Sequence, residues 1–259
     1  MMIDLYNYSL LTIFLTSLAV VWAVTELGWQ LAVRGDGRGG ANILTLETAA
    51  LGLLALMIGF TFAMALERFD ARRNAVLMEA NAIGTTALRA RLLPEPHRAE
   101  TVKLMRDYVQ VRLDVISSGL SLTELKGAVD RSNALQERLW QQATAMAAKD
   151  KALVPTGLFI QALNQMIDNQ EVRLTALRNR VPNIVPLALY AIAAVAAGFA
   201  GYASALEARR TRLPAYIMGV LVICVIYVIL DLDRPSSGFI TNNQQAMIDT
   251  AASIRSISE

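Results

Sequence analysis

Histidine and cysteine, whose side chains often carry acid–base, nucleophilic or metal chemistry, are scarce in this chain. It has one histidine, His97, and one cysteine, Cys224. A metal site built on these residues needs further histidine or thiolate ligands, and a catalytic thiol needs a base beside it. His97 stands in the loop-like stretch Pro94 to Arg98, so we interpret it as a surface residue, and Cys224 lies inside an apolar run. The sequence therefore predicts no enzyme, no metal site, no cofactor and no disulfide within the chain.

Three glycines, Gly35, Gly37 and Gly40, have the G-x-G-x-x-G spacing that is typical of dinucleotide-binding loops. That spacing cradles phosphates only when a strand precedes it and a helix follows within a βαβ unit. No strand pattern precedes Gly35. We therefore interpret these glycines as a flexible turn outside the membrane.

Long charge-free runs are the dominant feature of the sequence, and each is long enough to cross a bilayer, which takes about 20 apolar residues. Composition agrees, because 54% of the residues are hydrophobic and the mean hydropathy is +0.40. The net charge of +2 gives no reason to expect a nucleic-acid partner. The chain is predicted to be an integral membrane protein in contact with lipid. The four runs are Leu5 to Thr25, Thr48 to Leu66, Val181 to Leu206 and Leu213 to Leu230.

The order of these runs predicts an all-α fold with two transmembrane helices, a helical insert, and two further transmembrane helices. We expect the first two spans within residues 1–66, the insert at 67–180, the last two spans at 181–230 and a C-terminal tail at 231–259. The first span lacks a basic region before it and should be retained rather than cleaved. The third span is rich in alanine and glycine, which permits close helix packing, either within one subunit or between subunits.

The insert is predicted to be helical throughout. Apolar residues recur at helical spacing after the second span, and no proline occurs before Pro94, so one helix should run unbroken from about Thr45 to about Leu92. Gly84 is tolerable inside such a helix. Three further helices are expected at about Pro96 to Ile116, from a capping box at Ser121 and Glu124 to about Ala148, and from about Pro155 onward.

The distribution of arginines gives two conflicting indications of orientation. Arginines on the insert side, such as Arg72, Arg73 and Arg180, favour a cytoplasmic insert and cytoplasmic termini under the positive-inside rule. The first span argues the other way, because no basic residue precedes it and Arg34 follows it. We expect the insert and termini in the cytoplasm.

Two segments resemble the bestrophin family. In the second span Gly59-Phe60 is followed after seven residues by Arg68 and an aromatic residue, and after the fourth span comes Asp231-Leu-Asp233-Arg-Pro235. The order of spans is similar as well. The phrase Glu79-Ala-Asn-Ala-Ile-Gly84 is similar to bacterial membrane proteins described as bestrophin-like.

The resemblance implies a homopentamer in a bacterial inner membrane, with the second span of each subunit lining a central ion pathway. Its apolar neck would fall on Gly52, Leu56 and Phe60. Gly52 replaces a bulky residue, so that end of the neck should be wide. The acidic calcium clasp of animal bestrophins is missing, and Asp231 with Asp233 would be a thin calcium site.

Elementary physics gives a compatible but less specific picture. Residues spaced by four share one helix face, apolar constrictions gate by dewetting, and rings of charge at a mouth tune ion choice. The same residues could equally serve as lipid-facing packing and interfacial anchors, and the acids could neutralise nearby arginines. The predicted charged collar consists of Glu67, Arg68, Asp70, Arg72, Asp231 and Asp233.

Two function classes follow from the sequence. The first is an oligomeric bestrophin-like ion channel, with a slight preference for monovalent cations implied by the resemblance. The second is a non-conducting membrane scaffold or sensor that displays the helical insert to a partner. A continuous axial pathway lined by the second span would separate the two.

Overall fold

The structure, a computed structural model, describes residues 5–35, 40–117, 122–149, 154–206, 211–235 and 238–257. Within these ranges the regular elements are all helices, and the all-α fold class is confirmed. The elements are η1 (Leu5–Asn7), α1 (Leu10–Arg34), α2 (Gly40–Ala90), α3 (His97–Ser117), α4 (Leu122–Lys149), α5 (Val154–Arg178), α6 (Ile184–Leu206), α7 (Leu213–Asp233) and α8 (Gln245–Arg255).

Four of these helices, α1, α2, α6 and α7, are long and apolar enough to cross a membrane, as the sequence predicted. The second of them is continuous from Gly40 to Ala90, so the expected unbroken helix is confirmed and Gly84 does not interrupt it. The bounds of α3 and α5 also agree with the prediction. The predicted N-cap Ser121 and the centre of the glycine turn lie outside the described residues.

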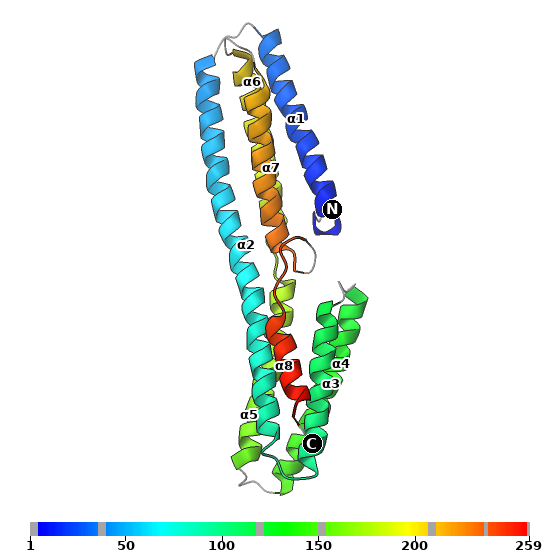
Figure 1. Cartoon of the computed structure of the whole chain (residues 1–259). Coiled ribbons are helices and arrows are strands. Elements are labelled where there is room, and N and C mark those ends of the chain that lie inside the picture. Colours follow the sequence, from blue (N-terminus) through cyan, green and yellow to red (C-terminus); the bar gives the residue numbers. More distant parts are fainter. Residues whose placement is uncertain are drawn as a thin grey trace. The chain divides into compact units, whose positions relative to one another are not determined.

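The chain divides into two compact units. We call Met1–Phe69, Arg180–Arg234 and Gly238–Ile240 the membrane unit, and Asp70–Asn179, Pro235–Ser237 and Thr241–Glu259 the insert unit. The membrane unit contains α1, α6, α7 and the first part of α2, which run side by side (Figure 1). Its core is aliphatic and includes Leu54, Leu189, Ile226 and Ile229.

Close backbone contact between α1 and α6 fixes the membrane unit. A Cβ atom added to Gly28 would collide with the backbone carbonyl of Gly198, and one added to Gly201 would collide with the carbonyl of Thr25. Such approach is open only to residues without a side chain, and it allows dispersion forces to hold helices together where water expulsion gives no driving force. The small residues of the third span therefore pack within one subunit.

The insert unit packs α3, α4, α5 and α8 with the remaining part of α2. Its core combines side chains that are fully buried, among them Ile83, Leu104, Met105, Phe159 and Leu163. Helix α8 contributes Met247, Ala251 and Ile254 to the same core, although the sequence analysis treated this segment only as a tail. Its amphipathic spacing at positions 247, 251 and 254 was a readable signal.

Candidate functional site

Helix α2 presents two different faces within the membrane unit. Leu54, Thr61 and Ala65 are at most 2% exposed and face the packed helices. The Thr61 hydroxyl is satisfied locally, since it donates to the Met57 carbonyl oxygen at 2.7 Å. Leu56 and Phe60 lie on the other face and are 56% and 63% exposed. The face that carries them is thus uncovered within one protomer.

Gly52 continues this uncovered face by one turn. It is exposed, and no atom lies within 4 Å of the position that a Cβ would take. Residues 52, 56 and 60 follow one another at intervals of four, which places them on one side of the helix. The structure therefore positions all three predicted neck residues on one uncovered face, and their role in a neck stays a prediction.

The uncovered face of α2 differs in composition from that of α7. Exposed side chains along α7 are bulky and aliphatic, as lipid contact favours, and include Ile217, Leu221, Val225 and Val228. Exposed positions along α2 alternate bulky residues with small ones, which in membranes are typical of helix–helix contact. The small exposed residues of α2 are Ala49, Gly52, Ala55, Gly59 and Ala63.

Four of the predicted collar residues lie within α2, directly after its apolar part. Glu67 and Asp70 are exposed, Arg68 is half-buried, and Arg72 is only 1% exposed. Glu67 and Arg68 belong to the membrane unit, whereas Asp70 and Arg72 belong to the insert unit. The gathering of these residues with Asp231 and Asp233 in one collar stays a prediction.

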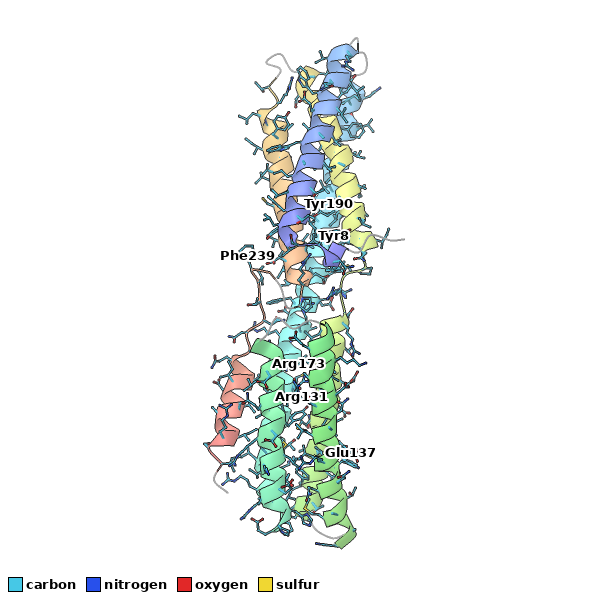
Figure 2. The ribbon with its side chains drawn as sticks, turned by 90° about the vertical axis from the view of Figure 1, so that its right-hand side faces the viewer. Tyr8, Arg131, Glu137, Arg173, Tyr190 and Phe239 are labelled. Atoms are coloured by element: carbon cyan, nitrogen blue, oxygen red, sulfur yellow. The ribbon has the colours of Figure 1, made fainter. Side chains whose placement is uncertain are left out.

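Asp231 is buried at the end of α7 and binds backbone amides. It accepts hydrogen bonds from the backbone N–H of Phe239 at 3.0 and 3.2 Å and from that of Ile240 at 2.9 Å. Figure 2 labels Phe239, whose side chain is exposed, in the segment that follows α7. The carboxylate therefore fixes the course of the chain after the last span.

Asp233, one residue further, ties three parts of the membrane unit together. Its Oδ2 accepts hydrogen bonds from the backbone N–H of Val181 at 2.9 Å and from the Tyr6 hydroxyl. The guanidinium of Arg180 stacks on the Tyr6 ring with its carbon 4.8 Å from the ring centre. The start of α6, the end of α7 and the N-terminal η1 thus meet at one carboxylate.

Burial and charge around Asp233 shift the pKa values of its neighbours. Burial raises the pKa of the Tyr6 hydroxyl, and its hydrogen bond to Asp233 raises it further, so Tyr6 is a neutral donor at physiological pH. Burial lowers the pKa of Arg234, whose Nη2 donates to the Tyr8 carbonyl oxygen at 2.7 Å. These groups act as structural ties rather than as proton donors in a reaction.

The two aspartates consequently have a use that does not involve a metal. N–H donors bind both oxygens of Asp231, and N–H and O–H donors bind Oδ2 of Asp233. Oδ1 of Asp233 is buried without a hydrogen-bond partner on the described residues. Among the described residues no three His, Cys, Asp or Glu side chains gather closely enough to hold a metal ion.

A second polar cluster, which the sequence analysis missed, lies at the opposite ends of α1 and α7. Glu26 accepts hydrogen bonds from Arg212 Nη1 at 2.9 and 3.0 Å and from the Tyr216 hydroxyl at 2.9 Å. The Arg212 guanidinium stacks 3.5 Å from the centre of the Trp29 ring. Glu26 is the sole acid between the described ends of α1, and that isolation in an apolar segment was the available signal.

His97 and Cys224 are the single histidine and the single cysteine of the chain. His97, predicted to be a surface residue, is half-buried, and its Nδ1 lies 2.8 Å from Gln142 Oε1, so it links α3 to α4. Cys224 is a free cysteine exposed on the surface of α7. Among the residues that the structure describes, neither belongs to a group of three or more His, Cys, Asp or Glu side chains.

The helices and the two units define the class of protein: a membrane protein with four candidate spans, two on either side of a helical insert. Residues 12–247 match the Bestrophin-like domain family. The chain therefore belongs to the bestrophin-like family. No curated protein matched the sequence.

Solved structures share the fold at low identity. A variant of a bacterial bestrophin homologue from Klebsiella pneumoniae superposes with a TM-score of 0.71 at 12% identity, covering 96% of this chain and 100% of that chain. Another variant of that homologue gives a TM-score of 0.69 at 13% identity, covering 95% and 96%. A structure described as a membrane protein gives 0.68 at 14% identity, covering 95% and 97%.

Proposed function

We propose that this protein is an oligomeric bestrophin-like ion channel, a homopentamer in which α2 of each subunit lines a central pathway. The observation that carries the proposal is the uncovered face of α2. It combines small residues with Leu56 and Phe60, whereas bulky side chains predominate on the exposed face of α7. A face of this kind suits contact with other copies of α2 around an axis better than contact with lipid.

Gly52, Leu56 and Phe60 form the neck of the proposed pathway. Repeated around an axis, Leu56 and Phe60 make two apolar rings one helical turn apart, and such rings impede ions by excluding water. Gly52 adds no side chain to the third level, so the neck is widest there. The open space around the Gly52 Cβ position is consistent with this arrangement.

The proposed selectivity is for monovalent cations. Glu67 and Asp70 are exposed on α2, whereas Arg72 is buried and Arg68 is half-buried. Repeated by symmetry, exposed acids form a ring of negative charge, which attracts cations. The same proposal places the protein in the bacterial inner membrane, with the insert and the termini in the cytoplasm.

Reconstitution of the purified protein tests the proposal. Native mass spectrometry in detergent or nanodiscs measures the number of subunits, and a stable monomer would contradict the assembly. Ion flux is then measured in vesicles shown to contain intact oligomers, with K⁺, Na⁺ or Cl⁻ as the only permeant ion. Flux of K⁺ and Na⁺ above that of Cl⁻ is expected. Absence of flux for all three ions would favour a scaffold that displays the insert.

A further inference from the structure

The interior of the insert unit holds more positive than negative charge. Glu79 of α2 and Arg112 of α3 have side chains with no exposed area, and that of Arg173 of α5 is 4% exposed. Arg112 Nε lies 2.7 Å from Glu79 Oε1, and Arg173 Nη1 lies 2.5 Å from Glu79 Oε2. Figure 2 labels Arg173 among the packed helices of this unit. Two guanidinium groups thus share one carboxylate.

No other acid on the described residues of the insert unit balances this charge. Glu79 is the one buried carboxylate described there. The Tyr108 hydroxyl lies nearby, but burial and the charge of Glu79 raise its pKa, so it stays neutral. Burial lowers the pKa of Arg173. The negative charge of Glu79 raises this pKa, and the positive charge of Arg112 lowers it. The cluster therefore carries a surplus of one positive charge in a water-poor interior, where an uncompensated charge is costly.

Several buried N–H groups of the two arginines lack a hydrogen-bond acceptor. All three side-chain nitrogens of Arg112 and Nε of Arg173 are buried without a hydrogen-bond partner on the described residues. Arg112 Nε and Glu79 Oε1, although 2.7 Å apart, also lack hydrogen-bond geometry with each other. The neighbouring amide side chains belong to a separate row of hydrogen bonds through Tyr108. Gln136 donates to the Tyr108 hydroxyl at 3.2 Å, which donates to Gln170 at 2.9 Å. Buried donors in native proteins nearly always have a partner.

A further donor lies at the same level. Tyr108 of α3 pairs with Gln136 of α4, and the two helices run antiparallel, as the pairing of Glu100 with Arg138 indicates. Arg112 lies one turn after Tyr108 on α3, and Ser132 lies one turn before Gln136 on α4. The antiparallel register therefore places Ser132 opposite Arg112. The Ser132 hydroxyl is also fully buried without a hydrogen-bond partner on the described residues. The donors converge on a common level of the bundle.

We propose that the insert unit binds a small monovalent anion of halide size between Arg112, Arg173 and Ser132. Its charge balances the second guanidinium, and its surface accepts the unpaired N–H and O–H donors. The complete burial of the Arg112 side chain favours a small ion, because a carboxylate of a second subunit or a bulky oxyanion needs more space than a halide. The proposal does not depend on the proposed ion pathway.

The test compares thermal unfolding of the intact full-length protein in sodium chloride and in sodium gluconate at equal ionic strength. Specific binding should raise Tm in chloride by about 3 °C, the shift expected when chloride is at several times its dissociation constant. Arg112→Met removes the surplus charge and leaves the Glu79–Arg173 pair neutral, so its Tm should be equal in the two salts. Arg138→Met, at an exposed ion pair with Glu100, should keep the full difference.

Crystals of the unaltered protein grown in sodium bromide give a second measurement that does not depend on the variant folding. An anomalous peak beside the Arg112 guanidinium is expected. Equal Tm values for the unaltered protein in both salts, or bromide crystals with ordered water in place of that peak, would overturn the proposal. A chloride shift that persists in Arg112→Met would overturn it as well, because the anion would then bind elsewhere.

Discussion

Gly238 leaves open the space that the Asp231 carboxylate fills. The φ angle of Gly238 is +134°, and a Cβ at this position would collide with Asp231 Oδ1. The missing side chain therefore serves two purposes at once. It permits a backbone conformation that other residues rarely adopt, and it lets the following two amides reach the carboxylate at the end of α7.

Gly238→Ala should destabilise the protein by about 1–3 kcal/mol, because it adds backbone strain and displaces Asp231 from its amide donors. Thermal unfolding in detergent measures the effect. Gly157→Ala is the matched control, since Gly157 lies in α5 with no atom within 4 Å of its Cβ position. That control should be neutral or slightly stabilising. Equal Tm changes for the two variants would contradict the role of Gly238.

Gly28→Ala should weaken the packing of α1 on α6 by about 1–3 kcal/mol, the usual cost of forcing extra volume into a packed interface. The added methyl group meets the backbone of Gly198, which cannot rotate away as a side chain could. The readout is the fraction of folded oligomer recovered at increasing temperature. Gly127→Ala in α4, where the Cβ position is open, should recover like the unaltered protein.

Arg68→Ala should lower the thermal stability of the oligomer more than Arg138→Ala. Arg68 is half-buried at the end of the apolar part of α2, and in the predicted collar its removal leaves an acid without compensation. A misplaced charge costs roughly 2.5–3.5 kcal/mol at the centre of a span and less at its rim. Arg138 is 53% exposed and pairs with Glu100 at the surface, which is worth little. Equal Tm changes would argue against a charged collar.

Replacing Leu56 and Phe60 together with alanine should raise ion flux in reconstituted vesicles several-fold, because a wider and less apolar constriction stays wet. Leu221→Ala with Val225→Ala on α7 is the matched control, since these residues are also apolar and exposed. The control should leave flux unchanged if α7 faces lipid. A rise in both double variants would indicate general loosening of the helices rather than a neck.

The sequence by itself determined the helices. Charge-free runs of about 20 residues, helical spacing in the insert and the absence of proline before Pro94 are local properties, and hydrogen bonding within each helix satisfies the backbone whatever surrounds it. This is why the unbroken α2 and the order of spans were predictable. Helix α8 was predictable for the same reason, because Met247, Ala251 and Ile254 recur at helical spacing.

Only the tertiary structure decided which side chains meet. Arg173 and Glu79 are 94 positions apart, and nothing in their local sequence indicates that they share a buried ion cluster with Arg112. Asp231 and Asp233 likewise resemble possible calcium ligands in the sequence, yet folding directs them to backbone amides and to Tyr6. Such pairings depend on how helices distant in sequence pack against one another, and helical periodicity alone carries no information about that partner choice.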